Sequence, residues 1–416
     1  MIERFFRAPW TVRRLRSGPL GPYLDGFARM LVEQGYAVGT GRSRLRLLGE
    51  LSEWLERRGL GVGDLDEALV AGFMAEAEQR RGHLRRSQSA VPRMLLGYLR
   101  EIGAVPDPPV EVEDTPLRRL EDDFVRYLVE ERGLSRSTGE RRVPLIRSFL
   151  LAHFGAGPLS LGALQPADVT RFFLRYTRSK SRLGRPRHPK SMVSALRSFF
   201  RFLLVRGDIT LDLAAAVPRV ATWRDSGLPK SLPPEQVRQL LASCDRSQPV
   251  GERDYALLLL LARLGLRAGE VLAMRLEDLD WQAGEILVRG KGQRLERLPM
   301  PRDVGKALVA YLRRRPSCAA REVFVRTRAP YRGLANDAGI DSIVRRALQR
   351  AGLDPPLKGA HLLRHSLATD MLRRGASMGE IGQILRHRRP STTEIYAKVD
   401  VEALRTLATP WPGAVP

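Results

Sequence analysis

Cysteine is almost absent from this chain of 416 residues, in which only Cys244 and Cys318 occur. Two cysteines so far apart predict neither a disulfide framework nor a cysteine-based metal site, and they fit a reducing compartment. Long apolar runs are also lacking, since the longest, Tyr255 to Ala262, is far shorter than the ~18 residues of a membrane span. No apolar segment follows the N-terminal arginines, as a secretory signal requires. We therefore expect a soluble, cytoplasmic protein without membrane contacts.

Acidic residues are too few to balance the basic ones. The chain has 46 Asp and Glu against 70 Lys and Arg, which gives a net charge of +24. This excess favours a polyanionic partner, because neutralised phosphates release counterions. The hydrophobic fraction of 43% is large enough for packed cores, so the chain is not a disordered polycation. Composition thus predicts a folded protein that binds nucleic acid.

Lysine is scarce among the cations. The lysines are Lys180, Lys190, Lys230, Lys291, Lys306, Lys358 and Lys398. A lysine can give up its proton at useful pH and an arginine cannot. Lys291, with a glycine on each side, is therefore of particular interest.

Residues 1–107 predict a helical unit. Apolar residues recur there at the three- to four-residue spacing of a helix from Leu24 onward. Asp64 is the predicted N-cap of the helix that follows a glycine-rich break. The proline-rich stretch from Pro106 to Pro109 predicts a linker.

The next segment, residues 112–218, repeats this plan. The run that starts at Phe27 aligns with a run 97 positions later, at Phe124, and the run at Leu95 aligns with one 104 positions later, at Phe199. The difference fits a loop insertion before the second match. A diverged duplication of one helical unit explains the pattern, and chance similarity of amphipathic helices is the alternative.

Basic residues concentrate in this second unit, with few acids between positions 178 and 190. A solvated helix face is the ordinary explanation of a charge run, whereas the shortage of acids favours a loop that follows DNA phosphates. The residues that we expect to bind DNA are Arg141, Arg142, Lys180, Arg182, Arg185, Arg187 and Lys190.

The last segment, residues 229–416, combines helices with a predicted β-hairpin. Residues 285–289 and 295–300 read as strands around the Gly290-Lys-Gly turn. Helices are predicted on both sides, including 360–374 and 377–385. The fold class that follows is mainly α with a small antiparallel β-sheet in the C-terminal domain.

Six residues of this segment form an ordered set that suits phosphodiester transfer without a metal: Arg267, Lys291, His361, Arg364, His387 and Tyr396. Such a reaction needs a nucleophile, cations at the non-bridging oxygens and an acid for the leaving oxygen. One guanidinium group can donate two hydrogen bonds to a phosphate, and a lysine or histidine can donate or accept a proton. Taken singly, Arg267 is better explained as a surface residue and Tyr396 as core packing, so the argument depends on the set.

A zinc site is the competing explanation of the histidines. His361 and His365 have the i, i+4 spacing of zinc-binding helices. The glutamate that follows the first histidine in zinc peptidases is missing, since Leu362 stands there. We expect no metal.

The ordered set resembles the tyrosine recombinases, a family of phage integrases, Xer resolvases and transposon integrases. The segment Leu264-Gly-Leu-Arg-Ala-Gly-Glu270 is similar to the first arginine box, with Glu270 as its supporting acid. The segment His361-Leu-Leu-Arg-His365 is similar to the second, with His365 as a further supporting residue. The Gly290-Lys-Gly turn resembles the lysine hairpin, and Tyr396 follows His387 at the Xer-like distance of nine residues. Arg386 departs from the pattern, because glycine is usual there.

The resemblance implies a core-binding domain at 112–218 and a catalytic domain at 229–416, which close on DNA as a clamp. The unit at 1–107 has no guaranteed counterpart. The implied reaction is site-specific recombination through a 3′-phosphotyrosyl intermediate and a Holliday junction, without a cofactor. Double-stranded DNA and three further protomers would be the partners, in a homotetramer or a paired heterotetramer on two sites. A C-terminal apolar stripe at 399–407 would dock on a neighbouring protomer, and packing on its own domain is the alternative.

Two alternatives stay open at this point. A type IB topoisomerase-like nicking-closing enzyme shares the chemistry, and a DNA-binding regulator with a relic site is the non-enzymatic alternative. The residues do not separate integration, chromosome resolution and the transposition of a mobile element.

Overall fold

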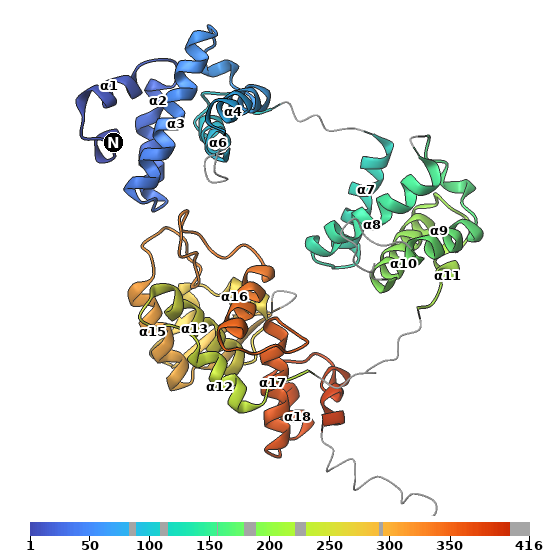
Figure 1. Cartoon of the computed structure of the whole chain (residues 1–416). Coiled ribbons are helices and arrows are strands. Elements are labelled where there is room, and N and C mark those ends of the chain that lie inside the picture. Colours follow the sequence, from blue (N-terminus) through green and yellow to red (C-terminus); the bar gives the residue numbers. More distant parts are fainter. Residues whose placement is uncertain are drawn as a thin grey trace, which may run out of the picture. The chain divides into compact units, whose positions relative to one another are not determined.

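The computed structural model describes residues 1–82, 89–108, 115–155, 157–178, 189–220, 230–290 and 294–399 (Figure 1). Among these residues, separate hydrophobic cores form from positions 2–105, 120–217 and 232–363. Residues Pro109–Ser226 are a compact unit of their own. The described part is mainly helical with one small antiparallel sheet, which confirms the predicted fold class. The three domain boundaries stay a prediction.

The first core lies among short helices. They are α1 (Pro9–Arg16), α2 (Gly21–Glu33), α3 (Val38–Arg57), α4 (Glu67–Arg81) and α6 (Val91–Glu101), with 3₁₀ turns at Ile2–Arg4 and Val62–Asp64. Asp66 caps α4, since its carboxylate accepts a hydrogen bond from Leu69 N at 2.7 Å. The predicted cap at Asp64 is wrong because the 3₁₀ turn delays the helix, and Asp64 accepts from Gly61 N instead.

The second core belongs to the unit Pro109–Ser226. Its elements are α7 (Pro116–Arg126), a π-helical turn at Tyr127–Glu131, α8 (Arg136–Phe154), a 3₁₀ turn at Leu161–Ala163, α9 (Pro166–Arg178), α10 (Pro189–Arg206) and α11 (Leu213–Ala216). Phe149 of α8 packs edge-on against Phe172 of α9 and Phe200 of α10, with ring centroids 5.2 and 5.4 Å away. These aromatic contacts fix the three longest helices to one another.

The two offsets in the sequence correspond to one structural contact. Phe27 of α2 packs against Tyr98 of α6, with ring centroids 5.7 Å apart. The matching positions, Phe124 of α7 and Phe202 of α10, pack against each other at 5.5 Å. Aligned residues therefore meet in both units, which supports the duplication without testing it against chance.

The third core lies in the part of the chain that carries the catalytic candidates. Its elements are α12 (Pro234–Ala242), α13 (Pro249–Arg263), α14 (Ala268–Ala273), a 3₁₀ turn at Leu276–Asp278, β1 (Leu279–Asp280), β2 (Glu285–Arg289), β3 (Leu295–Pro299), α15 (Arg302–Arg314), α16 (Asp337–Arg350), α17 (Ala360–Arg373), α18 (Met378–Ile384) and 3₁₀ turns at Pro390–Thr392 and Glu394–Val399. Helix α13 is buried along every residue from Ala256 to Leu261. It contacts α15 and α17, so an apolar helix lies at the centre of the domain.

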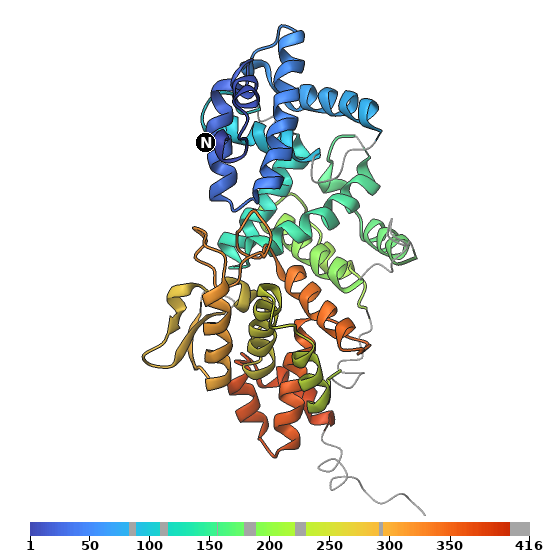
Figure 2. The ribbon, with the colours of Figure 1, turned by 60° about the vertical axis from the view of Figure 1, so that its left-hand side comes forward.

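The sheet has the order β1-β2-β3, and both pairs are antiparallel. Ile286 and Val288 of β2 are buried, and their partners across β3 are Leu298 and Glu296. Figure 2 shows the hairpin of β2 and β3, in yellow and orange, at the edge of the helices of its domain. The predicted strands are confirmed, although β3 ends one residue early, at Pro299.

Over the described residues, none of the helices combines the length and apolar character needed to cross a bilayer. The same residues contain no cluster of three or more His, Cys, Asp or Glu side chains that could hold a metal ion. The C-terminal stripe predicted to dock on another protomer falls on 399–407, where side chains lie outside the described part of the chain.

Candidate functional site

Arg267 is placed by a glycine turn between α13 and α14. Gly265 has φ +56°, and a Cβ atom there would lie 2.7 Å from a methyl group of Leu385, so any other residue would be strained. Glu270, three residues after Arg267, accepts hydrogen bonds from the Arg267 backbone N–H at 2.9 Å and from its Nη1 at 2.5 Å. The pair thus caps α14 and fixes the first cation.

Glu270 stays ionised although it is buried. Burial raises the pKa of this carboxyl, but the Arg267 N–H and the charges of Arg386 and Arg267 outweigh it and hold the pKa below its usual value. A charged carboxylate therefore stands between two arginines at the start of α14.

Arg364 is the buried cation of the site. Its Nη1 donates to the carbonyl of Gly265 and its Nη2 to that of Leu385, so it ties the α13–α14 turn to the end of α18. Burial, followed by repulsion from Arg267 and Arg386, lowers the pKa of Arg364 to about 10. The guanidinium is still protonated at neutral pH.

His387 follows directly on the C-terminal turn of α18. Its Nδ1 lies 2.7 Å from Thr393 Oγ1, which orients the ring. Burial, followed by the positive charges of Arg364, Arg267 and Arg386, lowers the pKa of His387 to about 4. A neutral imidazole therefore stands among three guanidinium groups at pH 7.

Tyr396 lies in the 3₁₀ turn Glu394–Val399 and is 1% exposed. Its hydroxyl is 2.9 Å from Nδ1 of His365, one turn along α17 from His361. Burial raises the pKa of Tyr396 to about 12, and burial followed by the charges of His361 and Arg364 lowers the pKa of His365. A neutral His365 thus faces a protonated phenol. His361 is exposed, and its ring centroid lies 6.4 Å from that of His365.

A cavity of about 890 Å³ opens beside these groups, lined by Arg267, Glu270, Arg386 and His387 among others. Tyr396, His361 and Arg364 are not among its lining residues. Lys291 lies outside the described residues, although the chain on either side of it, at Gly290 and Arg294, lines the cavity. Three of the predicted residues, Arg267, Glu270 and His387, thus line one cavity. Arg364 does not line it but is hydrogen-bonded to the carbonyls of Gly265 and Leu385, and the Tyr396 phenol belongs to an adjoining apolar cluster.

Four lining arginines were not predicted as site residues: Arg294, Arg386, Arg388 and Arg389. The run of arginines around His387 was a visible signal for three of them. Arg294 offered none except its position just after the lysine turn.

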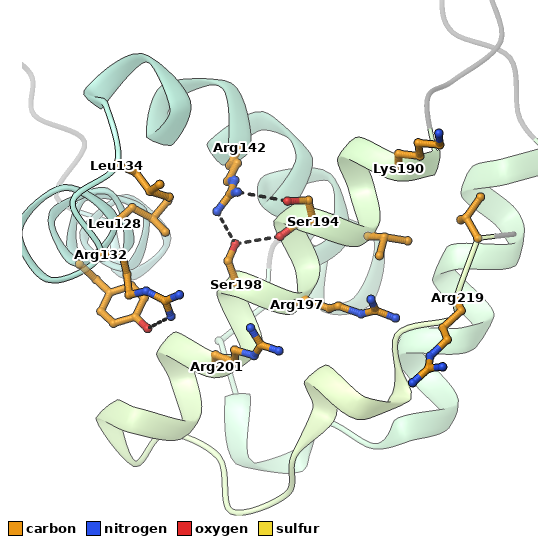
Figure 3. Close-up of a pocket in the computed structure, with 13 residues that line it drawn as sticks. Leu128, Arg132, Leu134, Arg142, Lys190, Ser194, Arg197, Ser198, Arg201 and Arg219 are labelled. Carbon is orange, nitrogen blue, oxygen red and sulfur yellow. Dashed lines mark hydrogen bonds between the residues drawn. The ribbon is translucent and has the colours of Figure 1, made fainter. Parts of the chain in front are cut away.

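A second cavity, of about 730 Å³, lies within the unit Pro109–Ser226 (Figure 3). The described residues that line it include no acidic one. The cations around it are Arg132, Arg142, Lys190, Arg197, Arg201 and Arg219. Six positive charges around one concave surface favour an anionic ligand.

Arg142 is held in this cationic cavity by two serines of α10. Its Nη1 donates to Ser198 Oγ at 2.9 Å and its Nη2 to Ser194 Oγ at 3.1 Å (Figure 3). Burial, followed by the charge of Arg132, lowers the pKa of Arg142. Neutral partners leave the guanidinium charge uncompensated.

The predicted DNA-binding residues divide into three groups. Arg142 and Lys190 line the cationic cavity. Arg141 points elsewhere on α8, where its Nε donates to Ser137 O at 3.1 Å. The other four lie outside the described residues: Lys180, Arg182, Arg185 and Arg187. The prediction missed Arg197 and Arg201, although with Lys190 and Ser194 they recur at the three- to four-residue spacing of one helix face.

Comparison with known proteins agrees with this arrangement. The model described as Phage integrase family matches residues 230–403, and that described as Phage integrase, N-terminal SAM-like domain matches residues 122–207. The protein y4rA of Sinorhizobium fredii, which carries the name integrase/recombinase, is 45% identical over 415 residues and 99% of both chains. Tyrosine recombinase XerD of Listeria monocytogenes is 31% identical over 289 residues, 67% of this chain and 94% of XerD.

Solved structures show the same fold. A XerH site-specific recombinase bound to a palindromic difH substrate aligns with a TM-score of 0.53 at 21% identity, over 73% of this chain and 99% of that one. The Tn1549 transposon integrase with circular intermediate DNA aligns at 0.50 and 17% identity, over 70% and 99%.

These matches place the chain among the enzymes that recombine DNA. The chain belongs to the phage integrase family, and it is a tyrosine recombinase that acts at specific DNA sites. The recombinase prediction is confirmed, and the topoisomerase-like and regulator alternatives have no support here.

Proposed function

We propose that Tyr396 is the nucleophile of strand cleavage and that Arg267 and Arg364 bind the scissile phosphate. The supporting observation is that Arg267 and His387 line one cavity, with Arg364 close enough to repel Arg267 and to lower the pKa of His387, beside a tyrosine whose hydroxyl contacts His365. Arg267 and Arg364 come from separate elements, and apolar packing does not require two guanidinium groups close enough to repel each other. The negative charge that develops on the phosphate in the transition state offsets the repulsion between the guanidinium groups.

In the proposed reaction the Tyr396 oxygen attacks phosphorus and forms a new P–O bond. The bond from phosphorus to the 5′ oxygen breaks, and Lys291 donates a proton to that oxygen. The phenol proton passes to His365, whose lowered pKa keeps it neutral and able to accept. His387 donates a hydrogen bond to a non-bridging oxygen. His361, which is exposed on α17, is the remaining proposed catalytic residue. The product is a 3′-phosphotyrosyl ester and a free 5′ hydroxyl, and the reverse attack rejoins strands.

The cationic cavity of the unit Pro109–Ser226 is proposed to bind the DNA backbone. Lys190 and Arg201 contribute two charges on one face of α10, and Arg142 lies on the facing helix α8. Lys180, Arg182, Arg185 and Arg187, which lie outside the described residues, and Arg141 are proposed to add further phosphate contacts. Sequence-independent contacts of this kind position a duplex and make binding sensitive to salt.

The double variant Lys190→Ala/Arg201→Ala is expected to bind DNA more weakly, with a shallower salt dependence. Two lost phosphate contacts reduce the slope of log affinity against log salt by ~1.8. Fluorescence anisotropy over a range of salt concentrations measures the slope. The matched control is Arg136→Ala, because Arg136 is exposed on the same unit and pairs with Glu140. Equal slopes in the double variant and the wild type would contradict the proposed surface.

We further propose that four protomers assemble on two DNA sites, as a homotetramer or with a paired recombinase. One nucleophile cuts one strand, so exchange of both strands between two duplexes requires four. The comparisons support DNA binding for the relatives, since XerH was crystallised as a complex with its difH substrate.

Light scattering of the complex with a cognate site is expected to give the mass of four protomers and two duplexes. Two sites with different labels should yield recombinant products in the same mixture. A complex of one protomer per duplex that relaxes supercoiled DNA would contradict the assembly, and it would favour a nicking-closing enzyme.

A further inference from the structure

Arg386 occupies a backbone position that favours glycine. It is the first residue beyond the C-cap of α18, with φ +55°, and among the described residues it is the only non-glycine with a positive φ. Its N–H donates to Gln383 O at 2.9 Å, and the N–H of His387 donates to Gly382 O at 2.9 Å. This pair of bonds is the Schellman motif, whose left-handed residue is usually glycine. Arginine is retained at a strained position, which suggests a role for its side chain.

The side chain of Arg386 reaches the acid that supports Arg267. It is 6% exposed, and its Nη2 donates to Glu270 Oε2 at 2.8 Å. Arg267 donates Nη1 to the other oxygen, Oε1, at 2.5 Å, and its Nη2 contacts the carbonyl of Arg386 at 3.4 Å. The three residues therefore form a closed ring of contacts.

The ring fixes Arg267 from two sides. Glu270 Oε2 also accepts the Arg267 backbone N–H, so Arg386 anchors the carboxylate without competing for the oxygen that holds Nη1. Arg267 is 36% exposed and lines the 890 Å³ cavity, so its guanidinium can meet a phosphate there. The Nε of Arg386 is buried without a hydrogen-bond partner among the described residues, and Glu296 Oε2 lies 3.8 Å from it.

We propose that Arg386 is a positioning residue of the cleavage reaction, which fixes Glu270 and the carbonyl contact so that Arg267 is held toward the phosphate in the cavity. This inference rests on the proposed phosphate-binding role of Arg267. It explains why an arginine replaces the glycine of the turn: the left-handed backbone directs its carbonyl to Arg267, and its side chain returns to Glu270.

The test is Arg386→Gly, a variant that keeps the turn because glycine adopts positive φ freely. Cleavage of a suicide-nicked site is expected to slow by up to ~10²-fold, as for other losses of orientation, while DNA affinity changes less than about twofold. Arg386→Lys should recover part of the rate, since a lysine keeps the charge near Glu270 and loses the fork. The control is Arg374→Ala, an exposed arginine paired with Asp370 outside the site.

Two readouts separate positioning from a merely structural role. In a Glu270→Gln background, Arg386→Gly should cause little further loss, because the neutral amide no longer needs the second cation. On a methylphosphonate site, which removes a non-bridging oxygen charge, the defects of Arg386→Gly and Arg267→Ala should shrink together. If the rate losses of Glu270→Gln and Arg386→Gly multiply in the double variant, the inference is overturned. It is also overturned if, on the methylphosphonate site, the Arg386→Gly defect persists while the Arg267→Ala defect shrinks.

The outcomes also separate this inference from the proposed function. Wild-type cleavage with an unimpaired Arg386→Gly variant overturns the positioning role and leaves the chemistry in place. If Arg267→Ala cleaves as fast as the wild type, both proposals are overturned, because Arg267 would then not bind the phosphate.

Discussion

Tyr396→Phe is expected to lower covalent adduct formation by more than ~10⁴-fold, with DNA affinity unchanged within about twofold. The ring packs with Ala368, Leu372, Ile381 and Leu385, and phenylalanine fills the same space. Only the hydroxyl that contacts His365 is lost. The measurement is a denaturing gel of protein incubated with a suicide-nicked site in the presence of a chelator.

The matched control for this experiment is Tyr255→Phe. Tyr255 lies on α13, half-buried beneath the guanidinium of Arg246, away from the site. This variant should form the adduct at the wild-type rate. An adduct with Tyr396→Phe, or a strict requirement of the wild type for magnesium, would refute the assignment of the nucleophile.

Lys291→Ala is expected to slow cleavage of an ordinary phosphodiester by ~10²–10⁴-fold, the usual contribution of a general acid. A 5′-bridging phosphorothiolate should be cleaved by the same variant at nearly the wild-type rate, because a thiolate leaves without a proton. Single-turnover rates on the two substrates measure the difference.

Arg267→Ala serves as the comparison, since Arg267 is proposed to bind the non-bridging oxygens. Its loss of ~10²–10³-fold should be similar on both substrates. Lys306→Ala, an exposed lysine on α15, should leave both rates unchanged. An equal loss for Lys291→Ala on both substrates would remove it from the role of acid.

Sequence alone predicted the elements whose signals are local. Residues 285–289, read as a strand beside a glycine turn, form β2. The resemblance to the family indicated Glu270 as the acid that supports Arg267, and the two side chains are in contact. The misplaced cap at Asp64 shows the limit of such signals. Asp64 and Asp66 both precede α4, and the 3₁₀ turn that contains Asp64 leaves Asp66 as the cap.

Tertiary contacts were not predictable in the same way. His365 meets Tyr396 across 31 positions of sequence, and nothing local distinguishes it from His361 as the contact. Arg132 and Arg219 reach one cavity from opposite ends of their unit. The contact between Arg386 and Glu270 depends on a left-handed backbone, which a sequence with arginine at that position does not suggest.

The packing of Tyr396 has a consequence for control of the enzyme. Its ring belongs to a small apolar cluster that is separate from the main core of the domain around α13. Clusters with few apolar contacts open at a lower free energy than a whole domain unfolds. We therefore expect that local opening of the turn Glu394–Val399 can expose Tyr396, the proposed nucleophile, while the arginines of the site stay folded. In an unbound protomer the Tyr396 hydroxyl would then stay buried, and its exposure would require only a local conformational change.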